Sequence, residues 1–235
     1  MKRTGIMMLS LLAFACSKTA DAPQSVPAAP AAKPKATAVN GPKLLPIDQA
    51  TTDPSLMQYL DDMLTAVRNQ DTSALLAGID PKIRTSFGAG GGIEAFEKQW
   101  KPENPDSPIW NELEHIFTLG GTFNKTSPAP QFWAPYIYSA WPEGQDSFQS
   151  LAVITTDVPL HKTAVISSPS IATLSFDIVK RGKEKSTDEH WINVTTADGR
   201  NGWVESRLVR SPIGYRAGFT KQSGQWKMDA LVSGD

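Results

Sequence analysis

The chain has 235 residues, with 23 Lys and Arg against 24 Asp and Glu, so its formal net charge is -1 at pH 7. This balance excludes the basic face with stacking aromatic side chains that nucleic-acid binding requires, and no nucleic-acid partner is expected. A single cysteine excludes an internal disulfide, so stability must come from a packed core, which seven tryptophans and nine phenylalanines can supply.

Residues 1–15 have the layout of a secretory signal peptide. Lys2 and Arg3 form a basic start, an apolar run follows, and small residues lead into Cys16. The apolar run is too short to cross a bilayer as a helix. We therefore expect an exported chain whose signal peptide ends before Cys16.

The stretch Leu12-Ala13-Phe14-Ala15-Cys16 resembles the lipobox of bacterial lipoproteins, although Ala13 stands where leucine is commonest. The resemblance implies a diacylglycerol on the Cys16 thiol, cleavage before Cys16, and acylation of the new amino group. Ser17, in place of an aspartate, implies sorting to the outer membrane, facing the periplasm. An ordinary signal peptide with an incidental cysteine, or a cysteine buried in the core, are the alternatives.

Residues 16–43 are rich in Ala, Pro, Lys, Ser and Thr and show no apolar periodicity. Such a segment cannot bury enough surface to offset the entropy lost on ordering. We expect a disordered, semi-extended tether with partial polyproline II character. A proline-rich ligand for a partner protein is the alternative.

Residues 44–145 are expected to form a mainly helical domain. Asp53 and Pro54 predict the start of a helix whose apolar positions recur at helical spacing up to Val67. A shorter helix should begin at Asp71 or Thr72. The remaining predicted features are, in chain order, a stop at Asp80-Pro81, a strand at 83–87, and helices at 93–100 and 108–119.

The densest aromatic stretch is 132–142, which contains Trp133, Tyr136, Tyr138 and Trp141. Such a stretch forms either a core seam or a stacking surface for sugar or peptide. Joint exposure of Trp133 and Trp141 would favour a ligand groove. Tyr136 and Tyr138 are therefore candidate ligand-binding residues.

From residue 146 to 212 the sequence changes to short β runs, and Asp198-Gly199 predicts a hairpin turn between two of them. Trp191-Ile192-Asn193-Val194, followed by Asp198-Gly199 and Gly202-Trp203-Val204, resembles bacterial SH3 domains. The resemblance implies a small SH3-like β-barrel, with Trp191 and Trp203 as candidate ligand-binding residues. The predicted strands lie at 151–155, 158–160, 172–179, 191–195 and 202–205.

Residues 213–235 predict a C-terminal β-hairpin packed on the rest of the protein, with Phe219, Trp226 and Met228 facing inward. The predicted fold class is thus α+β, with an N-terminal helical region, an SH3-like barrel and this hairpin. A second, local resemblance covers only 80–88, which is similar to a segment of envelope proteins with a nuclear-transport-factor-like cone.

No motif in the chain predicts catalysis. His115, His161 and His190 lie on different elements without the spacing of a metal site, and no G-x-S-x-G elbow occurs. The glycine run 88–92 lacks the Gly-Lys-Ser/Thr ending of a phosphate loop and predicts a flexible loop. We expect no enzyme activity, no cofactor and no metal.

The sequence therefore predicts a membrane-anchored periplasmic lipoprotein, held by the lipid on Cys16, that acts as a non-enzymatic binding or scaffolding module. Its expected ligand is cell-wall peptide from peptidoglycan, or an envelope protein. The alternative is a carrier of a small apolar ligand in a helical or cone-like pocket, which requires a cavity of about 300 Å³ or more beside the aromatic stretch.

Overall fold

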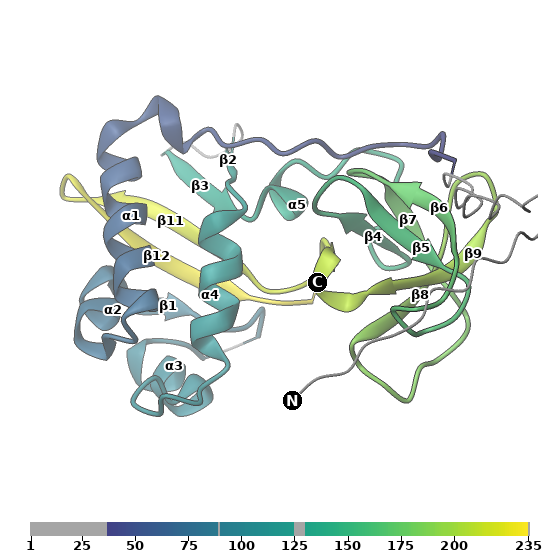
Figure 1. Ribbon diagram of the computed structural model, residues 1–235. Coiled ribbons are helices and arrows are strands. Elements are labelled where there is room, and N and C mark those ends of the chain that lie inside the picture. Colours follow the sequence, from purple (N-terminus) through teal and green to yellow (C-terminus); the bar gives the residue numbers. More distant parts are fainter. Residues whose placement is uncertain (1–36, 89, 125–129, 235) are drawn as a thin grey trace, which may run out of the picture. The chain divides into compact units, whose positions relative to one another are not determined.

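The computed structural model describes residues 37–88, 90–124 and 130–234, and two β-sheets organise them (Figure 1). The predicted signal peptide, Cys16 and the tether up to residue 36 lie outside the described residues. Within the described ranges, no helix has both the length and the apolar character needed to cross a membrane.

The first sheet has five strands in the order β1-β12-β11-β3-β2. Their bounds are β1 (Ile79–Arg84), β2 (Thr122–Phe123), β3 (Gln131–Ala134), β11 (Arg216–Gln222) and β12 (Gln225–Val232). β1 pairs with β12 in parallel, and the other pairs are antiparallel. The predicted C-terminal hairpin is confirmed as β11 and β12, but it lies in the middle of this sheet.

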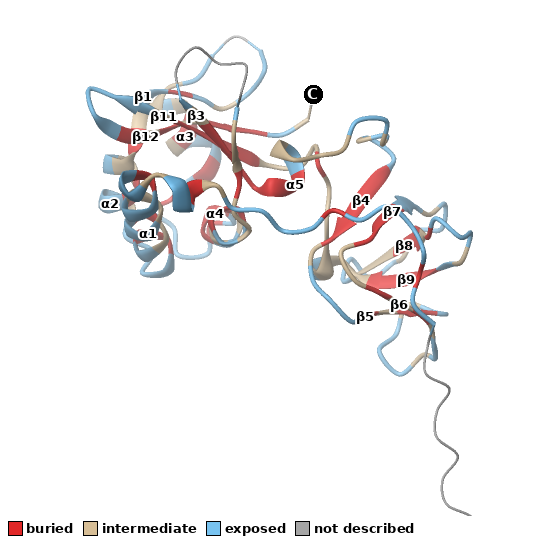
Figure 2. Cartoon of the chain, turned by 90° about the horizontal axis from the view of Figure 1, so that it is seen from above, coloured by how far each residue is buried: buried red, intermediate tan, exposed pale blue. Residues whose placement is uncertain are grey.

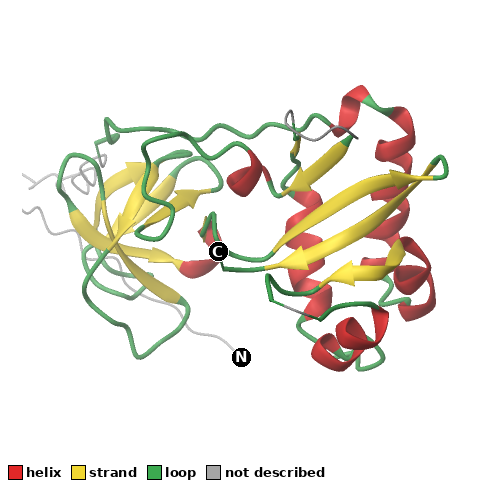
Figure 3. Cartoon of the chain, turned by 180° about the vertical axis from the view of Figure 1, so that it is seen from behind, coloured by secondary structure: helices red, strands yellow, loops and turns green. Residues whose placement is uncertain are grey.

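The helices between residues 54 and 118 lie on one face of the five-stranded sheet; Figure 3 shows the opposite face, where the strands stand in front of them. The Asp53 carboxylate accepts hydrogen bonds from the backbone N–H groups of Ser55 and Leu56, at 2.9 and 3.1 Å, which confirms the predicted start of the first helix. The elements are η1 (Ala50–Thr52), α1 (Pro54–Arg68), α2 (Thr72–Gly78), α3 (Ile93–Trp100), α4 (Ile109–Thr118) and α5 (Tyr136–Ser139).

The predicted stop at Asp80-Pro81 and the strand at 83–87 are wrong in their bounds. β1 begins at Ile79 and runs through Pro81. The strand is at the edge of the sheet, where the missing N–H of a proline costs no ladder hydrogen bond. Its partner β12 is about 150 residues later in the chain, so local sequence could not place the strand start.

Buried apolar side chains form one core between the helices and the sheet. Figure 2 colours the buried residues of both red. Phe219 on β11 is fully buried, and its ring centre lies 6.0 Å from that of Tyr59, 5.9 Å from Phe117 and 6.1 Å from Phe132. These rings come from α1, α4 and β3. The helices of the region 44–145 therefore do not form a separate domain. Together with β1, β2 and β3 they belong to an α+β unit that the C-terminal hairpin completes.

The second sheet has seven strands in the order β10-β4-β7-β8-β9-β5-β6. The predicted hairpin around Asp198-Gly199 is confirmed between β8 and β9, with Gly199 at φ 86°. The predicted strand 172–179 is two strands, β6 and β7, separated by Phe176 at φ 56°. The bounds are β4 (Ser150–Val153), β5 (Val158–His161), β6 (Ser170–Leu174), β7 (Ile178–Arg181), β8 (Trp191–Thr195), β9 (Asn201–Glu205), η2 (Ser206–Leu208) and β10 (Val209–Arg210).

The predicted SH3-like β-barrel is wrong. A barrel closes when its first and last strands pair, but β10 and β6 stand at opposite ends of the seven-stranded order and the described residues show no pairing between them. The motif from Trp191 to Val204 specifies only the β8–β9 hairpin, which is a local feature. Barrel closure is a long-range property that this motif does not determine.

Residues 37–43, which were predicted as part of the tether, pack along the second sheet. Ala38 forms a bridge with Thr173 of β6, and Lys43 forms one with Asp177. The Lys43 ammonium also lies 2.9 Å from the buried Asp177 carboxylate. The Arg200 guanidinium donates to the carbonyl of Ala38 at 3.3 Å. Main-chain bridges of this kind leave no apolar periodicity, so the sequence pattern did not indicate them.

Replacing Phe219 with alanine should lower the free energy of unfolding by about 3–5 kcal/mol, because it opens a cavity among two buried rings and one partly buried ring. Urea denaturation measures the change. Phe148, which is 52% exposed, is the matched control, and Phe148→Ala should stay within about 0.5 kcal/mol of the native protein. Equal losses for the two variants would contradict this assignment of the core.

Candidate functional site

A pocket of about 710 Å³ lies at the β2 edge of the five-stranded sheet. We call it the edge pocket. It is formed by the segment before α1, by β2 and β3, and by α5 and the residues after it. The lining residues are Ile47, Gln49, Thr122, Phe123, Asn124, Trp133, Tyr138, Ser139, Ala140 and Glu143.

Gln49 is fixed to the edge strand at two points. Its backbone N–H donates to the Gly121 carbonyl at 2.9 Å, and its side-chain Oε1 accepts from the Phe123 N–H, also at 2.9 Å. The amide Nε2 makes no hydrogen bond with the described residues. Gln49 therefore offers its Nε2 donor to the pocket, because its Oε1 acceptor is already bonded to the Phe123 N–H.

Thr122 ties β2 to α5. Its N–H donates to the Ser139 Oγ at 3.2 Å, and its own hydroxyl donates to the Ser139 carbonyl at 3.2 Å. Together with Gln49, these bonds satisfy the N–H groups of the two edge-strand residues, Thr122 and Phe123. An edge occupied in this way is protected against addition of another strand, so this edge is suited to a small ligand and not to an extended peptide.

Two aromatic rings form the wall of the edge pocket. Trp133 is 9% exposed and Tyr138 is 36% exposed, and their rings meet edge to face with centres 5.4 Å apart. Trp133 is held over β11, where a Cβ at Gly218 would lie only 3.1 Å from ring atoms. The Tyr138 hydroxyl makes no hydrogen bond with the described residues. The wall thus combines fixed apolar surface with one free hydroxyl.

Behind Tyr138 lies a buried arginine. Arg216 is 3% exposed, its guanidinium carbon is 4.3 Å from the Tyr138 ring centre and 5.1 Å from that of Phe87, and it has no ion pair with the described residues. Cation–π attraction is strongest for desolvated cations. The arginine therefore fixes the Tyr138 ring. It also covers part of the ring, and a ligand cannot contact that part.

Glu143 carries the one formal charge among the lining residues of the edge pocket. It is exposed and makes no hydrogen bond or ion pair with the described residues. A carboxylate in this setting accepts hydrogen bonds from hydroxyl or amino groups and repels anions. It gives the pocket a negative rim.

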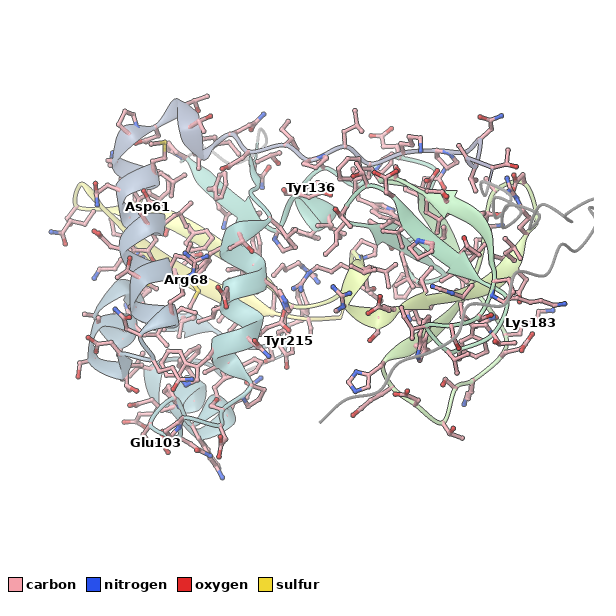
Figure 4. The ribbon with its side chains drawn as sticks, in the orientation of Figure 1. Asp61, Arg68, Glu103, Tyr136, Lys183 and Tyr215 are labelled. Atoms are coloured by element: carbon pink, nitrogen blue, oxygen red, sulfur yellow. The ribbon has the colours of Figure 1, made fainter. Side chains whose placement is uncertain are left out.

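The predicted ligand-binding residues fall at different places. Tyr138 lines the edge pocket, whereas Tyr136, labelled in Figure 4, is fully buried and burial raises the pKa of its phenol. Trp191 lines a separate pocket in the second sheet, and Trp203, 8% exposed, pairs with Asn193 in the β8–β9 hairpin. Burial removes Tyr136 from contact with a ligand, and binding by the other three stays a prediction.

Gln49 and Glu143 were missed by sequence reasoning. Each stands alone in a segment without a motif, and each reaches the pocket only because β2, α5 and the segment before α1 meet there. No sequence signal marks either residue. In the part of the chain that the structure describes, no group of three or more His, Cys, Asp or Glu is placed to hold a metal ion.

A second polar cluster lies on the helix-free face of the five-stranded sheet. Burial raises the pKa of the Asp229 carboxyl, although a hydrogen bond from the Thr220 side chain and the charge of Arg84 act in the opposite direction. Its Oδ1 is buried without a hydrogen-bond partner. Asp229 is the extra residue where the pairing of β11 with β12 shifts its register. This site offers a carboxyl that resists ionisation.

Comparisons with solved structures return NTF2-like proteins. An NTF2-like protein of unknown function from Shewanella oneidensis MR-1 is 12% identical and has a TM-score of 0.31, covering 79% of this chain and 99% of its own. One from Pseudomonas putida KT2440 is 10% identical with a TM-score of 0.25, covering 79% of this chain and 87% of its own. A variant named Rd1NTF2_05 is 11% identical with a TM-score of 0.30, covering 78% and 99%.

No protein-family model matches the chain, and no curated protein matches it. The predicted identity, a bacterial lipoprotein with a C-terminal SH3-like domain, is corrected by the seven-stranded sheet, whose end strands β10 and β6 do not pair in the described residues. TM-scores of this size carry no argument, and only the residues of this chain bear on its function.

The free energy of unfolding of Asp229→Asn should increase relative to that of the native protein as the pH rises. A carboxyl whose folded-state pKa lies above its ordinary value of 3.8 stabilises the fold below that value, and the stabilisation is lost as the pH rises through the folded-state pKa. Asp229→Asn removes the ionisation and therefore this loss. Urea denaturation at about pH 3.5, 5 and 7 measures the difference between the two proteins.

Asp53 supplies a control of opposite sign, because a hydrogen bond from Ser55 lowers the pKa of its carboxyl. Its stabilisation is present above the ordinary pKa and is lost as the pH falls, so Asp53→Asn should lose stability relative to the native protein at neutral pH. If Asp229→Asn and the native protein gave parallel curves from pH 3.5 to 7, the carboxyl would not be perturbed by burial.

Proposed function

We propose that the protein is a non-enzymatic binding module that holds a small molecule in the edge pocket. The observation that carries this proposal is a cavity of about 710 Å³, within the range usual for ligand pockets. Its aromatic wall faces the Gln49 amide and the Glu143 carboxylate, and neither Gln49 Nε2 nor the carboxylate makes a hydrogen bond with the described residues. The edge pocket lies beside the aromatic stretch 132–142, for which the sequence predicted either a core seam or a ligand groove.

The chemistry of the lining supports a ligand with one flat apolar part and polar groups at its rim. Trp133 and Tyr138 offer apolar surface, Gln49 offers an amide donor, and Glu143 offers an acceptor. Because Glu143 is the only charge in the lining, an uncharged or cationic ligand is favoured over an anion. The expected wholly apolar ligand fits less well, since half of the lining side chains are polar.

The position of the edge pocket also supports a binding role that leaves the core intact. The interior between the helices and the five-stranded sheet is filled by Phe96, Phe117, Phe132 and Phe219. A ligand at the sheet edge displaces none of these side chains. The predicted cell-wall or envelope-protein partner and the outer-membrane location stay predictions, because no feature of the described residues favours them over other partners or locations.

Three indole compounds of different charge test the proposal by ligand-observed NMR and calorimetry: tryptamine, indole and indole-3-acetate. Tryptamine should bind most tightly and indole-3-acetate least, because Glu143 attracts the ammonium and repels the carboxylate. Glu143→Gln should reduce the preference for tryptamine over indole-3-acetate by at least about tenfold, which corresponds to about 1.4 kcal/mol.

A pocket-filling variant tests the location. Ala140 lines the edge pocket and is half-exposed, so Ala140→Phe should block it and weaken tryptamine binding by at least about tenfold. Ala197 is exposed in the β8–β9 turn, and Ala197→Phe is the matched control that should bind as the native protein does. Unchanged binding in Ala140→Phe would place the ligand elsewhere and remove the proposal.

A further inference from the structure

A second pocket, of about 300 Å³, lies in the seven-stranded sheet between the end of β7 and the start of β8. We call it the loop pocket, because Gly182, Glu184, Lys185 and Ser186 of the loop between β7 and β8 line it. It is separate from the edge pocket in its lining and has the lower volume usual for ligand sites. The lining residues are Arg181, Gly182, Glu184, Lys185, Ser186, Trp191, Ile192 and Asn193.

Hydrogen bonds fix the base of the loop pocket. The Gly182 N–H donates to the Asn193 carbonyl at 2.8 Å, and the buried Asn193 amide exchanges hydrogen bonds with the Asn201 amide, both at 3.1 Å. A Cβ at Gly182 would overlap the Asn193 side chain, so only glycine fits there. At the other end, the Trp191 N–H donates to the Asp188 carbonyl at 3.2 Å. The loop is thereby anchored at both ends around the cavity.

Trp191 forms a fixed aromatic wall. Its ring stands at 86° to the ring of the buried His161, with centres 5.3 Å apart. His161 is held in turn by a hydrogen bond between Nδ1 and the Ser168 carbonyl at 2.9 Å. Trp191 itself is half-buried, so part of the indole lines the cavity while the remainder is packed.

The rim of the loop pocket is mainly positive. Arg181 and Lys185 line it, both are exposed, and neither has an ion pair with the described residues. Glu184 is the one acidic side chain in the lining. Lys180 and Lys183 flank the pocket and are also without ion pairs in the described ranges. Two cations against one anion leave a net positive lining, which favours an anionic ligand.

We propose that the loop pocket binds an acidic saccharide, with a ring carboxylate held by Arg181 and Lys185 and the C–H face of the sugar on Trp191. A guanidinium binds a carboxylate through two parallel hydrogen bonds, and a lysine adds a point charge. An aromatic side chain presents the apolar surface on which a sugar ring can stack. Glu184 accepts hydrogen bonds from sugar hydroxyls, which accounts for an acid in a cationic lining.

Trigalacturonic acid and its methyl ester are the probes, because esterification removes the charge of the carboxyl groups and leaves the sugar rings unchanged. Calorimetry with the protein should give a dissociation constant for the acid that is at least tenfold lower than for the ester. The Trp191 indole N–H resonance should shift on addition of the acid. Raising NaCl from 50 to 500 mM should weaken binding of the acid and leave the ester unaffected, since salt screens exposed charges.

Charge-neutral variants test the assignment of the rim. Arg181→Gln combined with Lys185→Gln should weaken binding of trigalacturonic acid at least tenfold without changing the thermal midpoint, because both side chains are exposed. Lys183, labelled in Figure 4, is exposed on the same loop but does not line the pocket. Lys183→Gln is therefore the matched control and should change the affinity less than twofold.

The outcomes separate this site from a general anion site and from the edge pocket. Equal affinity for acid and ester, or equal losses in Lys183→Gln and in the double variant, would overturn the proposal. Inorganic phosphate competing as well as the trisaccharide would reduce the site to simple ion binding, which also overturns it. Ala140→Phe, which blocks the edge pocket, should leave trigalacturonic acid binding unchanged.

Discussion

The insertion of the C-terminal hairpin between β1 and β3 is the constraint on which the five-stranded sheet depends. β11 pairs with β3 and β12 pairs with β1, so β1 is joined to the β2–β3 pair only through this hairpin. The hairpin also supplies Phe219 to the core and Gly218 to the surface under Trp133. The edge pocket therefore requires residues 216–232, although none of them lines it.

The elements that sequence predicted well are those fixed by local chemistry. Asp53 caps α1 as its side chain and the following proline indicated, and the turn between β11 and β12 uses Ser223 and Gly224, both at positive φ. The features that failed depend on distant partners. β1 starts at Ile79 because β12 pairs with it, and the second sheet is open because β10 and β6 do not pair in the described residues.

For the candidate sites, too, the local sequence indicated single residues but not which residues come together in the fold. The aromatic density of 132–142 indicated Tyr136 and Tyr138 together, but residues two apart on a helix point in different directions. On α5, Tyr136 enters the core while Tyr138 meets the pocket and Arg216. Gln49 and Glu143 could not be predicted, since their roles come from the meeting of three segments. The strand motif indicated Trp191. It did not indicate that Arg181 and Lys185 line the same pocket, because only the folded loop beside Asn193 brings them there.

The two pockets have similar aromatic walls and opposite charges, and this difference determines which ligand each can hold. Tyr138 and Trp133 lie beside a carboxylate, whereas Trp191 lies beside a guanidinium and an ammonium. Stacking alone discriminates little between flat ligands, because every such ligand has an apolar face. The charge at each rim discriminates more, since removing a charge from solvent is favourable only with an opposite partner. The edge pocket has one carboxylate in its lining, and the loop pocket has two cations and one carboxylate. Under the two proposals, Glu143 disfavours an acidic saccharide in the edge pocket, and Arg181 with Lys185 disfavours an amine in the loop pocket.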